Sequence, residues 1–258
     1  MKKISLALSG GGARCLFQLG FIEYLLQNNI EIDEISTVSG SSIIGTLLAQ
    51  NRTPNEILTL LQKVDFKKIV SLNLLKGSLF KFSKAKELLE EVLQIDNFED
   101  LDKKLYITVV NFDTSTIEYR ENGNLADTIL ASCSLYPIFD IYTMENSRYI
   151  DGGFMNNLPI EPLSDKNTIL SINVNPNYTI SNKKIKFLSK IKRVLFLLFY
   201  ANIEIRKKRG DFYFEHSEIG KYSILNRKDF EKFFKMGYNF AKNEDLTQNF
   251  IHNVKETI

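Results

Sequence analysis

Residues 3–14 read KISLALSGGGAR, an apolar stretch followed at once by three glycines. The apolar part, residues 3–8, predicts a short strand, and residues 15–28 have the apolar spacing of a helix, at Leu16, Leu19, Ile22, Leu25 and Leu26. Residues 35–39 then predict a second strand, and residues 42–50 a second helix. Two strands that alternate with two helices within about fifty residues are typical of a parallel sheet with crossover helices. The predicted fold class is therefore α/β.

The rest of the chain continues this pattern. A helix can begin at Pro54, and Ser83 to Gln94 predicts an amphipathic helix with Ser83 as its N-cap. Further strands are predicted at 104–110, 148–150 and 168–174, and further helices at 186–208 and 229–247. No repeat, low-complexity tract or Pro/Gly linker divides the chain. We expect residues 1–258 to form one domain, with a motif core of about 4–175 and a helical C-terminal part of about 183–258.

Composition excludes several classes of protein. The 258 residues include 33 Lys+Arg and 31 Asp+Glu, so the net charge of +2 does not fit a nucleic-acid-binding polycation. The hydrophobic fraction of 44% suits a globular protein rather than a disordered one. Cys15 and Cys133, with His216 and His252, are too few and too scattered for a structural zinc site. We expect no metal or cofactor, no calcium dependence and a reducing compartment.

No segment predicts export or a membrane span. Residues 4–8 follow two lysines, but a signal-peptide core needs roughly 7–15 apolar residues. Arg14 precedes Cys15 where a lipoprotein site needs a small residue. The longest apolar run, Val194 to Ala201, falls short of the roughly 18 residues that a membrane span requires. We expect a cytoplasmic protein that meets membranes only peripherally.

Gly10, Gly11 and Gly12, followed by Ala13 and Arg14, lie between the first strand and its helix. Backbone N–H groups in such a turn can point together at a helix N-terminus, which is an anion-binding geometry. An ordinary tight turn is the alternative. A dinucleotide loop is disfavoured, because the third glycine of G-x-G-x-x-G would fall at Cys15 and no Lys-Ser/Thr pair follows.

The sequence Ser39-Gly40-Ser41-Ser42 joins the second strand to the second helix, where a nucleophile elbow presents its hydroxyl. We predict Ser42 as the nucleophile, because Gly40, two positions earlier, relieves crowding in that turn. The alternative is that Ser41 or Ser42 caps the helix. The G-x-S-x-G pattern is incomplete, since Ile44 occupies its last glycine position and Gly45 comes one residue later.

Asp151-Gly152-Gly153 directly follows the apolar pair Tyr149-Ile150. Alone, such a motif is often a turn in which Asp caps backbone amides. Together with the glycine loop and the serine turn, however, the motif favours an active site. All three follow strands, and the carboxyl ends of parallel strands meet at one edge of the sheet, where α/β active sites lie.

In their order and spacing, these three motifs resemble the patatin-like phospholipase family. The resemblance extends to Phe17-Gln18-Leu19-Gly20, to Ala131-Ser132-Cys133-Ser134 with Pro137 and Phe139, and to residues 156–162, NNLPIEP. It implies a three-layer α/β/α fold with a mostly parallel sheet. It also implies a serine acyl hydrolase that cleaves fatty-acyl esters of phospholipid or lysophospholipid. The implied site has Ser42 as nucleophile, Asp151 as base, Gly10 to Arg14 as oxyanion hole, and Gly40, Gly152 and Gly153 in support.

Other interpretations stay open. Cys15 and Ile44 stand where the family usually has glycine, so a catalytically silent lipid-binding or regulatory protein with this fold is the alternative function. A triad of Ser42, Asp151 and His216 is disfavoured, because His216 follows a strand-like alternation at 211–215. For Arg14 we expect a side chain that braces the loop or neutralises charge, rather than one that contacts a lipid phosphate.

Residues 183–209 contain ten Lys/Arg and one acid, Glu204, a local charge of +9. Inside this segment Val194 to Tyr200 is wholly apolar, which suits peripheral contact with an anionic membrane surface. A buried core helix with solvated ends is the alternative. Two stretches that mix Lys with apolar residues, 66–70 and 79–82, are expected to flank the mouth of the site.

Overall fold

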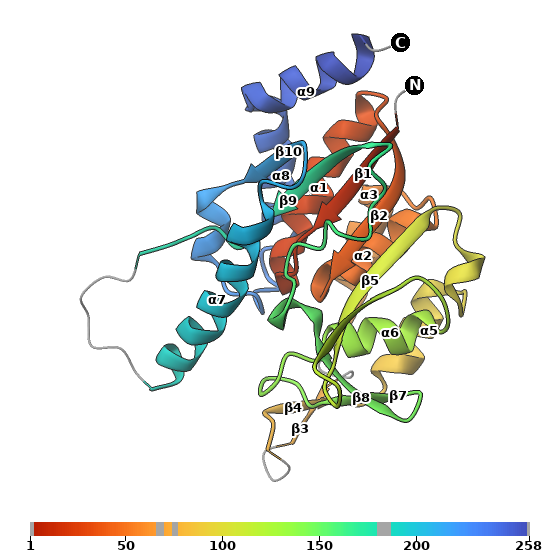
Figure 1. Ribbon diagram of the computed structural model, residues 1–258, viewed down its shortest axis with the longest axis vertical. Coiled ribbons are helices and arrows are strands. Elements are labelled where there is room, and N and C mark those ends of the chain that lie inside the picture. Colours follow the sequence, from red (N-terminus) through yellow and green to blue (C-terminus); the bar gives the residue numbers. More distant parts are fainter. Residues whose placement is uncertain (1–2, 66–69, 74–76, 180–186, 257–258) are drawn as a thin grey trace.

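The computed structural model describes residues 3–65, 70–73, 77–179 and 187–256 (Figure 1). Except for Val70, the predicted flanking stretch 66–70 lies outside these residues. In the described part, an eight-stranded sheet has the order β10-β9-β1-β2-β5-β8-β7, and β6 also pairs with β5. The strands are β1 (Lys3–Leu8), β2 (Glu31–Val38), β5 (Lys104–Asn111), β6 (Thr116–Arg120), β7 (Tyr142–Met144), β8 (Ser147–Asp151), β9 (Thr168–Asn173) and β10 (Phe212–Glu215).

The pairing of these strands is mostly parallel. β10, β9, β1, β2 and β5 run in the same direction, while β6, β8 and β7 add antiparallel pairs beyond β5. The predicted α/β class with a mostly parallel sheet is therefore confirmed. A separate antiparallel pair is formed by β3 (Val70–Leu72) and β4 (Phe80–Phe82).

Helices connect and cover the strands. They are α1 (Cys15–Gln27), α2 (Gly40–Ala49), α3 (Pro54–Lys63), α5 (Ala85–Leu93), α6 (Leu125–Ser132), α7 (Phe187–Arg206), α8 (Phe230–Asn243) and α9 (Asp245–Glu256). Short 3-10 turns are η1 (Gly12–Arg14), η3 (Phe98–Asp100), η4 (Gly152–Phe154) and η5 (Ser217–Lys221). The start of α3 is specified locally, because the Thr53 and Glu56 side chains cap each other's backbone amides.

Several predicted boundaries differ from the structure; β2, for example, is Glu31–Val38 rather than 35–39. α2 begins at Gly40, two residues before the predicted start, and this shift moves the strand-to-helix turn. Lys84 rather than Ser83 is the N-cap of α5. The predicted helix 229–247 is two helices, because Glu244 adopts an extended backbone between α8 and α9.

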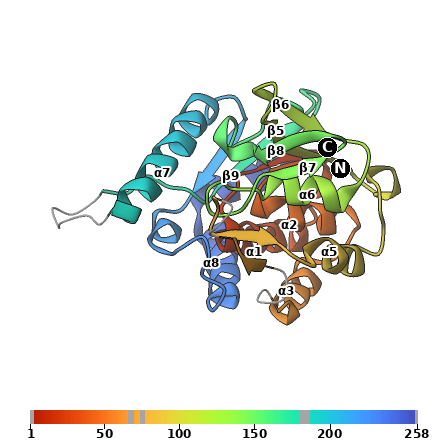
Figure 2. The same cartoon turned by 90° about the horizontal axis from the view of Figure 1, so that it is seen from below.

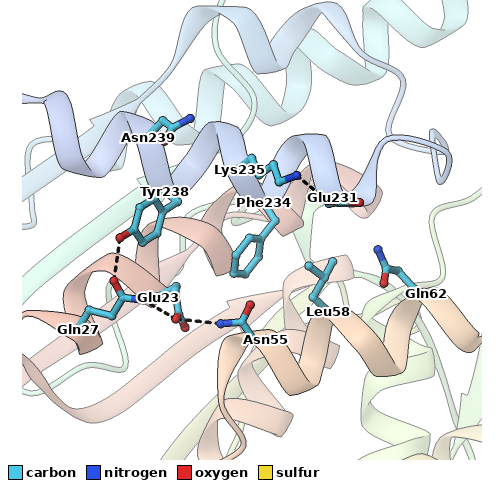
Figure 3. Close-up of a pocket in the computed structure, with 10 residues that line it drawn as sticks. All are labelled: Glu23, Gln27, Asn55, Leu58, Gln62, Glu231, Phe234, Lys235, Tyr238 and Asn239. Carbon is cyan, nitrogen blue, oxygen red and sulfur yellow. Dashed lines mark hydrogen bonds and ion pairs between the residues drawn. The ribbon is translucent and has the colours of Figure 1, made fainter.

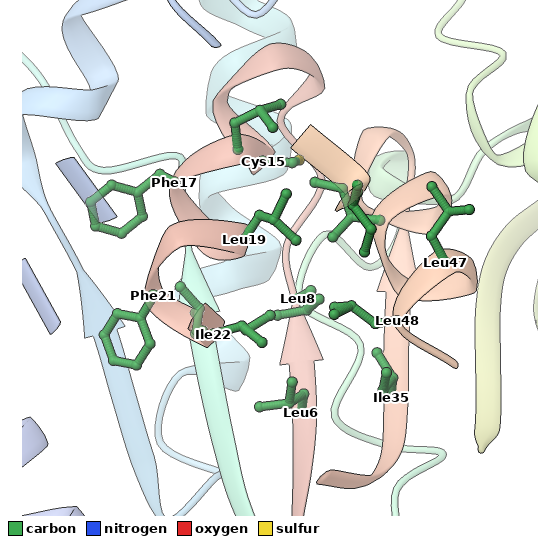
Figure 4. Close-up of a cluster of buried hydrophobic side chains, with 14 of the residues drawn as sticks. Leu6, Leu8, Cys15, Phe17, Leu19, Phe21, Ile22, Ile35, Leu47 and Leu48 are labelled. Carbon is green, nitrogen blue, oxygen red and sulfur yellow. The ribbon is translucent and has the colours of Figure 1, made fainter. Parts of the chain in front are cut away.

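The sheet buries both of its faces, as the alternation of side chains along β1 illustrates. Leu6 and Leu8 point into a large cluster with α1 and α2, where Phe17, Leu19, Ile22 and Leu47 are wholly buried (Figure 4). Ala7, between them, points to the other face. There the cover is thinner and comes from residues 158–163 and the C-terminal half of α7: Leu158, Ile160, Leu163 and Ile203.

α7 is a surface helix along its apolar middle. None of the residues from Val194 to Tyr200 is buried, and the helix extends away from the body of the protein (Figures 1 and 2). The alternative of a buried core helix is therefore wrong for this segment. No helix in the described part of the chain is long and apolar enough to cross a membrane.

Helices α1 and α8 pack unusually closely, and two glycines permit this contact. A Cβ added at Gly20 would lie 1.9 Å from the Phe234 carbonyl oxygen. A Cβ added at Gly237 would lie 1.9 Å from the Phe17 carbonyl oxygen. Because both obstructing atoms belong to backbone, a side chain at either position forces the two helices apart.

We expect Gly237→Ala to lower the free energy of unfolding by about 1–3 kcal/mol, the usual penalty for overpacking a core. Asn239→Ala, on the exposed side of the same helix, is the matched control and should leave stability nearly unchanged. Urea denaturation followed by circular dichroism measures both values. Equal stability of the two variants would contradict the close contact.

Candidate functional site

The register of three strands brings the motifs together at one edge of the sheet. In β1 and β2, Leu8 pairs with Thr37, which places Gly10 beside Ser39. β5 pairs first with β2, up to Thr108 opposite Val38, and its next residue pairs with Asp151 of β8. β8 therefore pairs with the same edge of β5 as β2 does, and its pairing begins where that of β2 ends. Ser39, the residue after Val38, and Asp151 are neighbours for this reason.

Ser39 occupies the sharp turn between β2 and α2. Its backbone has φ 57° and ψ −133°, a strained conformation for a residue with a side chain, typical of a residue held for function. Its N–H donates to the Ser132 hydroxyl at 2.7 Å, and that hydroxyl donates to the Thr108 carbonyl oxygen at 2.8 Å. Ser39 is half-buried, whereas Ser41 and Ser42 are wholly buried.

Ser42, the predicted nucleophile, lies one helical turn further on. Its hydroxyl donates to the Ser39 carbonyl oxygen at 2.6 Å, and its surface is fully buried. Ser41 is also buried and bonds to the Leu8 and Val38 carbonyl oxygens. The structure therefore brings Ser39, not Ser42, to Asp151, and the two later serines support the start of α2.

The sequence pattern did not single out Ser39 as the residue of the turn. The prediction started the helix at Ser42, so the turn was placed three residues too late. An elbow residue is the last one before the helix, and the helix begins at Gly40. In this register Gly45 faces β2, where an added Cβ would lie 2.4 Å from Thr37 Cγ2, while Ile44 is buried in the main core.

Asp151 is almost completely buried, with 1% of its surface exposed. Burial raises the pKa of its carboxyl to about 7, against the lowering effect of hydrogen bonds from the Ser39 side chain and from the Gly153 N–H at 2.8 Å. Cys133 is adjacent, and burial together with the nearby Asp151 charge raises the pKa of its thiol to about 12. The carboxyl is thus a weak acid that faces the Ser39 hydroxyl.

The glycine loop packs directly on the serine turn. A Cβ added at Gly10 would lie 2.9 Å from Ser39 Cβ, and one at Gly40 would lie 2.7 Å from Gly12 Cα. Only glycine permits these approaches. Within the loop, the Ala13 N–H donates to the Ile224 carbonyl oxygen at 2.8 Å, and the Arg14 N–H donates to the Gly11 carbonyl oxygen at 3.2 Å. Those two predicted oxyanion donors are engaged within the protein.

Arg14 braces this loop, which is the role predicted for its side chain. Its guanidinium donates to the carbonyl oxygens of Tyr222 at 2.8 Å, Gly220 at 3.1 Å and Val174 at 3.3 Å. The side chain is 7% exposed, and burial lowers its pKa. Arg14 therefore ties the segment 220–222 to the loop and does not face solvent as a phosphate ligand.

His216 lies elsewhere. Its Nδ1 accepts a hydrogen bond from the Glu218 N–H at 3.2 Å, and its ring packs edge-on to Phe240 at 5.0 Å. These contacts place His216 at the start of η5, in a capping role, rather than beside Asp151.

A groove of about 390 Å³ lies between α1, α3 and α8 (Figure 3). Its ten lining residues include none of Gly10 to Arg14, Ser39, Ser42 or Asp151. Its walls are joined by hydrogen bonds, from Tyr238 of α8 to Gln27 of α1 at 2.7 Å and from Asn55 of α3 to Glu23 of α1 at 2.9 Å. The groove is a polar seam between helices and is separate from the serine turn.

Comparisons with known proteins identify the family of the chain. The family model for patatin-like phospholipase matches residues 6–164. The chain is 30% identical over 182 residues to the probable lipid hydrolase 463L of Invertebrate iridescent virus 6, covering 61% of this chain and 62% of that protein. It is 23% identical over 282 residues to lysophospholipase nte1 of Aspergillus niger, covering 94% of this chain but only 18% of that protein.

Among solved structures, VipD from Legionella pneumophila matches with a TM-score of 0.58 and 13% sequence identity, covering 98% of this chain and 67% of that one. This likeness concerns the fold. Since the family model matches more than half of the chain and includes all three motifs, the chain belongs to the patatin-like phospholipase family.

Proposed function

We propose that the protein is a serine acyl hydrolase with Ser39 as nucleophile and Asp151 as general base. The observation that carries this proposal is the strand register. It sets a strained, accessible serine beside a buried carboxyl and a glycine loop at one sheet edge. Family membership supports lipid acyl hydrolysis in general. The choice of Ser39 over Ser42 rests on accessibility and on the contact with Asp151.

In the proposed reaction, Ser39 Oγ attacks the ester carbonyl carbon while its proton passes to the Asp151 carboxylate. The N–H groups of Gly10, Gly11 and Gly12, with that of Gly40 after the nucleophile, receive the negative charge on the carbonyl oxygen. When the intermediate collapses, the C–O bond breaks and the leaving alcohol takes the proton from Asp151. Water then hydrolyses acyl-Ser39 through the same steps.

The raised pKa of Asp151 suits this role. An ordinary aspartate has a pKa of about 3.9 and accepts a proton from a hydroxyl poorly. Burial brings the pKa of Asp151 to about 7, near the pH at which a base is both ionised and effective.

The proposed substrates are phospholipids or lysophospholipids. The chain spans less than two thirds of the relatives named lysophospholipase or lipid hydrolase, so their activities support the proposal without establishing it. Phe82 stacks on Phe139 at 4.9 Å, and Phe80 lies 6.2 Å from the same ring. Phe139 follows Ser134, whose carbonyl oxygen accepts a hydrogen bond from the Asp151 N–H at 3.0 Å, and we propose that these rings form an apolar wall for the acyl chain. We also propose that the basic segment 183–209 meets an anionic membrane surface, as a peripheral contact.

The alternative function, a catalytically silent lipid-binding or regulatory protein, loses its main support. It rested on Ile44 inside the elbow, but with Ser39 at the turn Ile44 belongs to the core and Gly45 makes the close contact with β2. In this register Thr37 and Ser41 occupy the two glycine positions around the nucleophile.

We expect Ser39→Ala to lower fatty-acid release from lysophospholipid by at least about 10³-fold, since it removes the nucleophile. Ser42→Ala is the matched control, one turn away, and should retain most of the activity because the Ser42 hydroxyl bonds to the Ser39 carbonyl oxygen and to Cys133 rather than to Asp151. Release is measured by titration of free fatty acid. The opposite pattern, with Ser42→Ala inactive and Ser39→Ala active, would restore Ser42 as nucleophile.

The activity should depend on pH through Asp151. Because the base must be ionised, kcat/KM is expected to rise as the pH increases and to level off above an apparent pKa of about 7. The measurement is a pH–rate profile with a soluble ester. An acid limb centred near pH 4 would show that the base titrates like an ordinary aspartate, and would contradict the raised pKa of Asp151.

The free energy of unfolding should also depend on the ionisation of Asp151. Unlike the activity, it should fall as the pH rises. The native carboxyl binds its proton up to a pH of about 7, whereas the unfolded one releases it near 3.9. Between these values Asp151 lowers the free energy of unfolding by about 1.4 kcal/mol per pH unit as the pH rises. Asp151→Asn should therefore be more stable than the unchanged protein at pH 8, with the difference vanishing near pH 4. Thermal melting at both pH values provides the test.

A further inference from the structure

The outward face of α7 is apolar. Val194, Leu197, Leu198 and Ile205 expose 58%, 46%, 50% and 66% of their surface, and Ala201 between them is also exposed. Their spacing of three and four residues places them on one side of the helix, here named the outer stripe. A surface helix normally turns such a stripe toward the core. In α7 it points away from the core.

The charge around the outer stripe identifies what fits it. Lys190 and Lys192 are exposed near the first turn of α7, and Lys208 and Arg209 are exposed just beyond the last. Glu204, the one acid in residues 183–209, is paired with Lys207 at 2.8 Å. Apolar side chains between clusters of cations match the interior and the head groups of an anionic lipid surface.

The inner face of α7 contacts the loop after Asp151. Asn202 is 8% exposed, its Oδ1 accepts from the Asn157 N–H at 2.7 Å, and its Nδ2 donates to the Gly153 carbonyl oxygen at 3.0 Å. One turn earlier, the Phe199 ring packs edge-on to Phe154 at 5.4 Å. Both contacts hold η4 and the residues that follow it.

These contacts lie one step from the proposed catalytic groups. The Gly153 N–H donates to the Asp151 carboxylate at 2.8 Å. The Asn157 side chain lies between two glycines, since a Cβ at Gly153 or at Gly10 would be 2.8 Å or 2.6 Å from its Oδ1. Asn202 therefore supports both the Asp151 loop and, through Asn157, the glycine loop.

The two halves of α7 are held differently. In the C-terminal half, Ile203 is wholly buried and Arg206 pairs with Glu161 at 2.7 Å. In the N-terminal half, Arg193 and Phe196 contact Tyr178, and the helix otherwise extends away from the sheet (Figures 1 and 2). A force on the outer stripe thus acts on a helix that is fixed near Asn202.

We propose that α7 couples membrane docking to catalysis: the outer stripe inserts into an anionic lipid surface, and Asn202 transmits the docked position of the helix to the Asp151 and glycine loops. This inference rests on the proposed function. Docking fixes the N-terminal half of α7, and this restricts the positions that η4 can adopt. A larger fraction of molecules then has Ser39, Asp151 and the loop amides aligned for reaction. Asn202 is a positioning residue in this scheme.

The experiment measures hydrolysis of the soluble ester p-nitrophenyl butyrate with and without vesicles of ether-linked phosphatidylcholine and phosphatidylglycerol, which offer no ester bond. Vesicles should raise the rate of the unchanged protein by at least about fivefold. Leu197→Gln/Leu198→Gln should lower binding to these vesicles, measured by co-sedimentation, by at least about tenfold, with loss of the stimulation. Leu246→Gln, an exposed leucine on α9, is the matched control and should bind and respond normally.

Asn202→Ala tests the coupling itself. It should bind vesicles as the unchanged protein does, yet show a ratio of stimulated to basal rate near one. A merely structural role would lower both rates by the same factor and leave the ratio unchanged. Asn202→Asp keeps the acceptor for Asn157 but loses the donor to Gly153, and is expected to lose the stimulation as well.

Besides an unchanged ratio of stimulated to basal rate in Asn202→Ala, three results would overturn the inference. Vesicles that leave the rate of the unchanged protein constant would exclude the coupling, while Ser39-dependent turnover would still uphold the proposed function. Unreduced vesicle binding by the Leu197/Leu198 variant would exclude the outer stripe as the docking face. Absence of any Ser39-dependent turnover would remove the proposed function and the coupling with it.

Discussion

The site depends on one change of partner along β5. Up to Thr108 this strand pairs with β2, and from Val109 onward the place of β2 is taken by β8. β2 must end there because its chain turns into α2, and the vacated edge of β5 receives the strand that ends in Asp151. The parallel strand β2 and the antiparallel strand β8 thus both end at β5, opposite its adjacent residues Thr108 and Val109. Backbone hydrogen bonds, which fix register to the residue, set the distance between the serine and the carboxyl more firmly than side-chain packing alone could.

The same arrangement imposes costs that the rest of the fold offsets. Ser39 has a strained backbone, the carboxyl of Asp151 is buried without a cation among its described contacts, and the glycine loop gives up conformational entropy. Each of these features is destabilising and each is required for the proposed chemistry. They persist because they follow strands whose side chains are buried on both faces, chiefly against α1, α2 and α8. A carboxyl held near a pKa of 7 is in this sense a product of core packing, since exposure to water would return it to its ordinary value.

Sequence reasoning predicted much of this architecture and failed at an instructive place. Local patterns were sufficient for β1, α1 and the parallel sheet, because apolar periodicity and glycine turns act within a few residues. Asp151 and the glycine loop could be paired from their positions after strands. The strand-to-helix turn was predicted at Ser42 instead of Ser39 because residues 39–42 offer three hydroxyls in four positions, and propensity alone does not tell which one precedes the helix. The choice depends on tertiary contacts: Ser132 binds the Ser39 N–H, and Gly12 leaves room only for Gly40. The exposure of α7 was undetermined for a similar reason, since an apolar run has the same pattern whether it is buried or faces outward.

The contacts of α7 explain why its apolar outer stripe stays exposed. An apolar stripe left in water has an unfavourable free energy of roughly 25 cal/mol per Å² of surface, and ordinary packing would remove it by rotating the helix. Rotation of α7 is blocked, because Asn202 is the partner of two backbone groups after Asp151 and Arg206 is the partner of Glu161. Turning the stripe inward would leave the buried Asn157 N–H and Gly153 carbonyl oxygen unpaired, at a cost of about 1–3 kcal/mol for each, and would break the ion pair of Arg206 with Glu161. The bonds that hold the loop beside the proposed base are therefore the same bonds that keep the stripe facing outward.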